Sequence, residues 1–312
     1  MTQITESVGS PATVIARREI QPRRRTYFSR VYPWLYLVVP LALLITFTYV
    51  PAVNLFYYSV TDWDGLSPQK NIIGLGNFVK IFTESKYLSV FGVSLYYIVA
   101  SFAQMALALY FAAILNFKTR FRSFFKGVIF FPYLINGVAV AFTFLFFFQP
   151  GGTLDSVLTA LGVSGDKPQW LGNPDLVNIS FACISVWRYM GLNFVLFLGA
   201  IQSIPNDLYE AAELDGASRW QQFRYIIAPG IKRIISLSFI LAIAGSLAVF
   251  EIPYIMLGGS NGSATFVIQT VRTFNLGNVG LASALAVVLL IIVLITTAIQ
   301  RRLVPDEDVS LS

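Results

Sequence analysis

The sequence contains no histidine, a single cysteine (Cys183) and few charged residues. Without histidine there is neither an imidazole acid–base catalyst nor a histidine metal ligand. One cysteine allows no intrachain disulfide and no thiolate metal cluster. Only 12% of the 312 residues are charged, about half the share of an average soluble domain, whereas 56% are hydrophobic. We therefore expect an integral membrane protein, because so apolar a chain suits neither a soluble domain nor a disordered one.

Six segments are apolar over a length that can cross a bilayer as a helix, which takes about 20 residues. They are 33–57, 88–116, 127–148, 176–202, 234–257 and 281–300. The first is too long for the core of a signal peptide, so we expect it to be retained. The sequence thus predicts an all-α membrane fold with six transmembrane helices in one domain, 33–300. A basic tail, 1–32, precedes this domain and a short tail, 301–312, follows it.

Basic residues indicate the orientation of these helices. Arg188 falls inside a span, five basic residues lie on one side of the membrane, and sixteen of the 22 lie on the other. The sixteen are Arg17, Arg18, Arg23, Arg24, Arg25, Arg30, Lys118, Arg120, Arg122, Lys126, Arg219, Arg224, Lys232, Arg233, Arg301 and Arg302. The positive-inside rule places both termini in the cytoplasm. This topology accounts for the net charge of +6, so we expect no nucleic-acid partner.

The fourth connection, 203–233, is predicted to be cytoplasmic and begins with the signals of a short helix. Asp207, followed three residues later by Glu210, predicts a capping box at the start of this helix. The helix is expected to run to Leu214, and Gly216 is suited to the left-handed conformation that ends it.

A second helix is expected in the same connection. Ser218 with Gln221 repeats the capping pattern and predicts a helix over 219–227, ending before Pro229. Two capped helices joined by a glycine bend predict a rigid protrusion. Three alanines beside the bend are small enough for a partner to approach closely: Ala211, Ala212 and Ala217.

The spacing within this connection resembles the EAA loop of permeases from binding-protein-dependent ABC importers. The matching residues, in order, are Glu210, Ala211, Ala212, Gly216, Ile226, Ala228 and Pro229. The family pattern usually has leucine before the proline, where this sequence has Ala228.

Further short motifs are similar to sugar permeases of the maltose-transporter type, and in order they cover most of 33–300. They are Thr61-Asp62-Trp63, Gly74-Leu75-Gly76-Asn77-Phe78, Trp170-Leu171-Gly172-Asn173-Pro174, and Trp187 with Gly191 and Asn193.

The resemblance implies an ABC importer type I permease subunit in a prokaryotic cytoplasmic (inner) membrane, forming half of the path for a sugar or related polyhydroxylated solute. The implied partners are a second permease, identical or homologous, two cytoplasmic ATPase subunits and an extracytoplasmic substrate-binding protein. ATP and Mg would be bound by the ATPase subunits and no cofactor by this chain, which lacks the phosphate-binding pattern G-x-x-x-x-G-K-[ST]. The implied ATPase-coupling residues are Glu210, Ala211, Ala212, Asp215, Gly216, Ala217 and Pro229.

Polar residues inside the predicted spans are candidates for the solute path. Amide, hydroxyl and aromatic groups suit an uncharged, polyhydroxylated solute. Hydrogen bonding between helices and aromatic packing at the interface are the simpler explanation for any one of them. The candidates are Gln104, Tyr133, Asn136, Trp187, Arg188, Asn193 and Glu251. Pro132 with Gly137, and Gly191, mark places where a helix is expected to be interrupted near the path.

Two candidates carry charge inside the membrane, where an ionised side chain costs about 2.5–3.5 kcal/mol. Arg188 is expected about 18 Å, and Glu251 about 9 Å, below the outer ends of their spans at 1.5 Å per residue. An extended arginine spans this difference, so we consider an Arg188–Glu251 ion pair as a hypothesis. The alternative is that each bonds separately, within the bundle or to the second permease.

Two other classes of protein compete with the permease. A self-sufficient secondary transporter or oligomeric channel commonly shows paired repeats and intramembrane acids, but here Glu251 is the only acid well inside a predicted span. An intramembrane enzyme needs a nucleophile–base pair or a metal constellation, and the sequence has neither in recognisable form. The EAA-like loop favours the importer permease.

Overall fold

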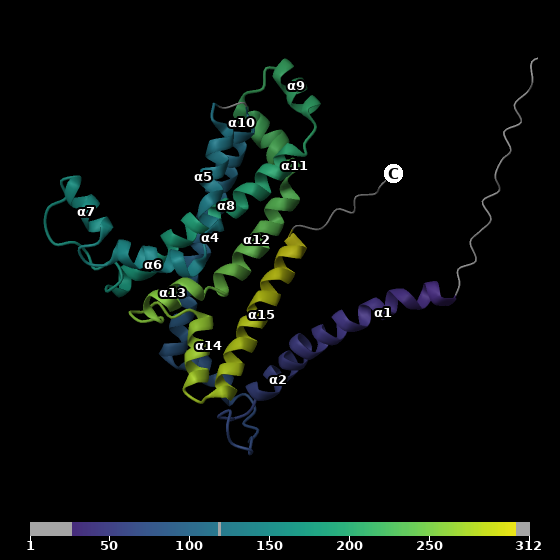
Figure 1. Cartoon of the computed structure of the whole chain (residues 1–312), viewed down its shortest axis with the longest axis vertical. Coiled ribbons are helices and arrows are strands. Elements are labelled where there is room, and N and C mark those ends of the chain that lie inside the picture. Colours follow the sequence, from purple (N-terminus) through teal and green to yellow (C-terminus); the bar gives the residue numbers. More distant parts are fainter. Residues whose placement is uncertain (1–26, 118–119, 304–312) are drawn as a thin grey trace, which may run out of the picture. The chain divides into compact units, whose positions relative to one another are not determined.

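The computed structural model describes residues 27–117 and 120–303, which form helices joined by short loops (Figure 1). Most of the basic N-terminal tail, Lys118 and the end of the C-terminal tail lie outside the described residues. The chain divides into two units, the first reaching Ala52 and the second beginning at Val53. In the first unit, α1 (Tyr27–Leu44) passes through one π-helical turn, η1 (Ile45–Tyr49), into α2 (Val50–Ser59), which continues into the second unit.

The described helices agree with the six predicted spans in number and position. Five candidate spans are long and apolar enough to cross a membrane, and a bent pair of helices, taken as one span, makes the sixth. The second unit supplies α4 (Ser85–Asn116), the bent pair α5 (Arg122–Leu134) and α6 (Gly137–Phe148), α8 (Pro174–Gln202), α12 (Lys232–Leu247) with α13 (Glu251–Leu257), and α15 (Val279–Leu303). The prediction of an all-α membrane fold is confirmed.

The third predicted span, 127–148, is not one straight helix. α5 and α6 meet at an angle of 95°, with a break at Ile135 and Asn136. The Asn136 side chain accepts a hydrogen bond of 2.9 Å from the backbone N–H of Val138 and so caps α6. The interruption expected near Pro132 and Gly137 is confirmed, because an Asn cap satisfies backbone that a straight helix would have paired.

The fifth span is also broken, between Leu247 at the end of α12 and Glu251 at the start of α13. The Thr265 hydroxyl donates a hydrogen bond of 2.6 Å to the carbonyl of Val249 within this break. Non-helical backbone at membrane depth is tolerated where protein groups satisfy it, and Thr265 does so here.

The central packing of the second unit is between α4 and α8, with α5 against α8 and α12 against α4 (Figure 1). Gly191 lies within α8, which is continuous, so the interruption expected there is wrong. A Cβ at Gly191 would lie 2.6 Å from the carbonyl oxygen of Ile129 and 3.0 Å from the Cα of Phe130. Glycine is therefore needed for the close approach of α5 to α8, not for a bend.

The motifs shared with sugar permeases near the predicted outer face have structural roles. Buried Asn77, in α3 (Gly76–Thr83), donates hydrogen bonds of 2.9 and 2.8 Å to the carbonyls of Ser59 and Thr61. Asn173 caps α8 by accepting a hydrogen bond of 2.9 Å from the N–H of Asp175. These side chains fix the loops that join the spans.

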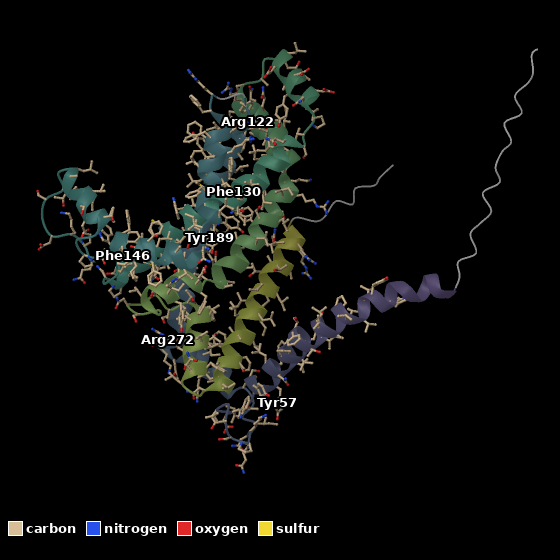
Figure 2. All side chains as sticks on the ribbon, viewed as in Figure 1. Tyr57, Arg122, Phe130, Phe146, Tyr189 and Arg272 are labelled. Atoms are coloured by element: carbon tan, nitrogen blue, oxygen red, sulfur yellow. The ribbon has the colours of Figure 1, made fainter. Side chains whose placement is uncertain are left out.

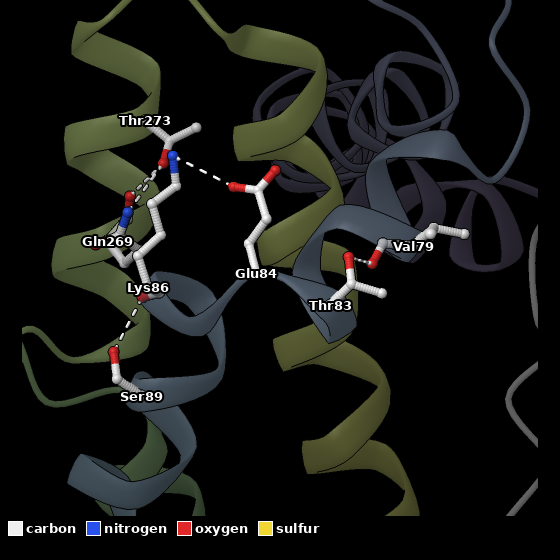
Figure 3. A network of polar contacts seen from close by, with 7 residues as sticks. All are labelled: Val79, Thr83, Glu84, Lys86, Ser89, Gln269 and Thr273. Atoms are coloured by element: carbon white, nitrogen blue, oxygen red, sulfur yellow. Dashed lines mark hydrogen bonds and ion pairs between the residues drawn. The ribbon is translucent and has the colours of Figure 1, made fainter.

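Apolar packing rather than charge holds α3 and α4 to α14 (Phe266–Asn275) and α15. Figure 3 shows the polar contacts at this junction, among them the Lys86–Glu84 ion pair at 3.5 Å. Both of these side chains are exposed, and such surface pairs contribute about 0–1 kcal/mol. A buried cluster of Ile81, Phe266 and Leu285 lies beside them.

The Gly191→Ala variant tests the α5–α8 contact. The added methyl would collide with backbone atoms of α5, and overpacking of this kind destabilises by about 1–3 kcal/mol. We expect a lower melting temperature in detergent. Gly199→Ala is the matched control in the same helix, because a Cβ there meets nothing within 4 Å. Equal melting temperatures for the two variants would contradict the close approach.

Candidate functional site

A cavity of about 460 Å³ lies between α4, α8 and the broken span α12–α13, with a mainly apolar wall into which several polar side chains are set. Polar residues recur at helical spacing in α4 and in α8, so each of these helices turns one polar face toward the cavity. From α4 these are Tyr97, Ser101 and Gln104; from α8 they are Ser185, Tyr189 and Asn193; and Ser246 and Glu251 complete the polar lining. Figure 2 shows Tyr189 near the middle of the second unit.

Three polar side chains of this cavity have no hydrogen-bond partner among the described residues. The Tyr97 hydroxyl is buried, in a residue only 2% exposed, and is unpaired. Gln104 and Asn193 are each 7% exposed, and their amides line the cavity without a side-chain hydrogen bond to the described protein. Buried polar groups are nearly always paired, so these three groups indicate a site for water or a polar ligand.

The hypothesis of an Arg188–Glu251 ion pair is confirmed. Nη1 of Arg188 lies 3.0 Å from Oε2 of Glu251. The Arg188 side chain is 11% exposed and that of Glu251 is 44% exposed, so the arginine is the more deeply buried partner. Nη2 of Arg188 also makes a longer contact, 3.5 Å, with the carbonyl of Ile135.

This ion pair joins the two broken spans. Ile135 lies in the α5–α6 break, and Glu251 is the first residue of α13. The Glu251 carboxylate also lies directly over Gly137, the first residue of α6, where a Cβ would be 1.9 Å from Oε2. Arg188, from the continuous α8, thus holds both breaks at one point.

Not all the predicted solute-path residues meet at the cavity. Gln104, Asn193 and Glu251 line it. Arg188 lies behind Glu251. The remaining three do not line it: Tyr133 contacts the ring of Tyr189, Asn136 caps α6, and Trp187 packs against Phe144 beside a separate apolar pocket.

Sequence reasoning missed the hydroxyl groups of the cavity. The Ser101 hydroxyl, for example, donates a hydrogen bond of 2.8 Å to the carbonyl of Ile98 in its own helix, as serines in transmembrane helices commonly do. The signal that would have found them is the recurrence of polar residues four and seven positions along α4. The missed residues are Tyr97, Ser101, Ser185, Tyr189 and Ser246.

The first helix of the EAA-like connection is α9 (Asn206–Leu214), and its predicted capping box is wrong. The N-cap is Pro205, without a side-chain hydrogen bond, so the helix begins just before Asp207. Asp207 instead lies in the first turn, where its negative charge is favourable beside the positive helix terminus.

The predicted glycine stop of α9 is confirmed. Gly216 has φ +75°. The N–H of Ala217 bonds to the carbonyl of Ala212 at 2.8 Å, and that of Gly216 to Glu213 at 3.1 Å. This pair of bonds is a Schellman motif, which satisfies the last carbonyls of the helix and fixes its exit.

The second helix starts as predicted but does not end as predicted. Ser218 and Gln221 form the capping box of α10 (Arg219–Gln222). The chain then continues through a π turn, η2 (Phe223–Ile227), into α11 (Ala228–Gly230). The helical path therefore passes Pro229, because the wider turn pairs the N–H of Ala228 with the carbonyl of Phe223.

The connection has a buried base and an exposed tip. Ile227 and Ile231 are buried in a cluster with Phe194 and Ile201 of α8. α9 has no buried residue, and Leu214 at its end is 90% exposed. Figure 1 shows α9, α10 and α11 together at one end of the second unit, away from α14. Of the predicted coupling residues, Ala212 and Ala217 are half-buried, and the others are exposed: Glu210, Ala211, Asp215, Gly216 and Pro229.

A helical bundle with two broken spans at a cavity, and a stiff exposed loop at one end, is the arrangement expected of a multi-pass membrane transport subunit. The family of binding-protein-dependent transport system inner membrane components matches residues 104–308. The chain belongs to this family.

Individual relatives agree over most of the chain. It is 34% identical over 281 residues to the probable ABC transporter permease protein YurN of Bacillus subtilis (strain 168), covering 88% of this chain and 96% of that protein. It is 30% identical over 283 residues to the multiple sugar-binding transport system permease protein MsmF of Streptococcus mutans, covering 89% and 97%.

The fold is shared with a solved structure described as a bacterial ABC transporter involved in the import of the acidic polysaccharide alginate. The TM-score is 0.76 at 24% sequence identity, covering 89% of this chain and 98% of that chain. The importer permease fold implied by the sequence motifs is confirmed.

Neutralising the ion pair one residue at a time tests its contribution to stability. Glu251→Gln leaves the deeply buried Arg188 unpaired, and an unpaired buried charge costs about 3–5 kcal/mol. Arg188→Gln is expected to cost less, because the carboxylate it leaves is more exposed. The double variant should be more stable than the sum of the single losses predicts. Strictly additive shifts in melting temperature would contradict the pair.

Proposed function

We propose that this chain is the permease subunit of an ATP-driven importer and forms half of the path for a sugar or related polyhydroxylated solute. The observation that carries this proposal is the cavity with the unpaired Tyr97 hydroxyl and the amides of Gln104 and Asn193. Hydroxyl and amide groups pair readily with sugar hydroxyls, and Tyr189 adds an aromatic wall.

The names of several relatives support the solute class. MsmF is named for multiple sugar-binding transport, and the Streptomyces coelicolor protein NgcF, 32% identical over 303 residues, for diacetylchitobiose uptake. The membrane is proposed to be the prokaryotic cytoplasmic membrane, with both termini in the cytoplasm, since this orientation agrees with the basic residues.

The other parts of the importer are proposed to be separate chains. A second permease would complete the path, and two cytoplasmic ATPase subunits would bind ATP and Mg, which leaves this chain without a cofactor or ATPase site. An extracytoplasmic substrate-binding protein would deliver the solute. One solved structure of similar fold is described as an alginate transporter in complex with a pentasaccharide-bound periplasmic protein.

The exposed tip formed by α9 and Gly216 is the proposed contact with an ATPase. The Schellman motif and the Ser218 capping box make this tip stiff, and the buried Ile227 and Ile231 fix it to α8. A stiff connection transmits movement, whereas a flexible loop would absorb it. Since α8 also carries Arg188 and Asn193, displacement of the tip would reach the cavity and the two breaks.

Tyr97→Phe tests the proposed solute site. The hydroxyl has no partner in the described protein, so its loss should leave the melting temperature unchanged. Loss of about 1 kcal/mol of hydrogen bonding to solute should raise the KM of ATP-dependent uptake roughly fivefold. Ser238→Ala is the control, because it also removes a buried unpaired hydroxyl but lies outside the cavity lining. An unchanged KM for Tyr97→Phe would contradict the site.

Gly216→Val tests the coupling loop. At φ +75° a β-branched side chain is strained, so the Schellman motif should open and uptake should be lost, with the protein still present in the membrane. Gly216→Asn is the matched control, since asparagine tolerates this conformation, and it should retain most uptake. Undiminished uptake by Gly216→Val would count against the coupling role.

A further inference from the structure

The cavity has one charged side chain among the described residues that line it, and this is Glu251. The other polar lining groups are hydroxyls and amides, which carry no net charge at neutral pH. The Glu251 side chain lines the cavity and is 44% exposed, so it is not enclosed by protein on all sides.

The cation that pairs with Glu251 does not line the cavity. The Arg188 side chain is only 11% exposed. Its Nη1 is directed to Glu251 and its Nη2 to the carbonyl of Ile135, and its guanidinium lies 5.3 Å from the ring centroid of Tyr189. A solute in the cavity would therefore meet the carboxylate edge of the pair, with the guanidinium behind it.

We propose that Glu251 makes this cavity select against anionic solutes, so that the path takes uncharged polyhydroxylated compounds and rejects uronates and phosphate esters. This inference rests on the proposed function and narrows its solute class. Sugar hydroxyls donate to a carboxylate, forming strong charge-assisted hydrogen bonds, while a second negative charge in the same low-dielectric space is repelled.

The proposal separates this chain from relatives and structures whose names indicate anionic solutes. These include the alginate transporter, described as importing an acidic polysaccharide, and the Yersinia pestis protein UgpA, named for sn-glycerol-3-phosphate transport. Fold and family are shared with these proteins, so neither decides the charge of the solute, and the proposal assigns this selection in the present chain to Glu251.

Charged thiol reagents measure the potential in the cavity without knowledge of the solute. The probe site is Ser185→Cys in a Cys183→Ser background, in the full chain within its native membrane. Ser185 lines the cavity and makes no side-chain hydrogen bond among the described residues. The probes are the trimethylammonium-ethyl and sulfonatoethyl methanethiosulfonates, which form a mixed disulfide with the thiolate and release methanesulfinate.

The reaction rate of each reagent at Ser185→Cys is divided by the rate of the same reagent at Ser164→Cys, a position in an exposed loop. With Glu251 present, we expect the cationic reagent to react about tenfold faster than the anionic one, as a neighbouring negative charge at intermediate dielectric requires. In Glu251→Gln this ratio should fall to one or below. In Arg188→Gln, which keeps the carboxylate, it should persist or increase.

Glu251→Gln alone leaves Arg188 unpaired and can misfold, so the double variant Arg188→Gln with Glu251→Gln is measured as well. The double variant leaves no unpaired buried charge, and its ratio of cationic to anionic rates should be close to one. A ratio that Glu251→Gln and the double variant leave unchanged would overturn the inference and leave the proposed function intact. If neither reagent reaches Ser185→Cys, the cavity is not a water-filled path, and the proposed function falls together with the inference.

Discussion

The ion pair between Arg188 and Glu251 joins the two places where the membrane-spanning backbone is broken. Broken helices are tolerated in a bilayer only where protein groups or a cavity satisfy the freed backbone. Here Arg188 contacts the carbonyl of Ile135 in one break, and Glu251 begins the helix after the other. A charge inside the membrane costs about 2.5–3.5 kcal/mol, and the ion pair lowers this cost most for Arg188, the more deeply buried partner.

The continuous helix α8 connects this ion pair to the loop that we propose meets the ATPase. It carries Arg188 and Asn193 at the level of the cavity and ends at Gln202, next to α9. Gly191 allows α5 to pack closely on it, and its last turns share a buried cluster with Ile227 and Ile231. We propose that this continuous helix transmits a displacement of the loop to both breaks.

Local patterns predicted the parts of the structure that depend on neighbouring residues. Long apolar runs predicted the spans, Gly216 predicted the end of α9, and Ser218 predicted the start of α10. The depths of Arg188 and Glu251 left their pairing as one of two alternatives. Features set by tertiary contact were not predictable in this way. The interruption after Leu134 was predicted, but its angle of 95° and the continuity of α8 at Gly191 depend on what packs against these segments. A single serine bonded to its own helix has the same sequence signature whether or not it faces a cavity, and only the recurrence of polar residues along α4 indicates the cavity hydroxyls.

The central claim is that this chain is one of the permease subunits of an ATP-driven importer, with α9 in contact with an ATPase subunit. A photoreactive amino acid in place of Leu214, at the exposed tip of α9, tests it most directly in the native membrane. The account predicts a cross-link to an ATPase subunit, identified by mass spectrometry, and solute flux that requires ATP. Absence of an ATPase from the cross-linked products, together with ATP-independent flux through the purified chain, would contradict it.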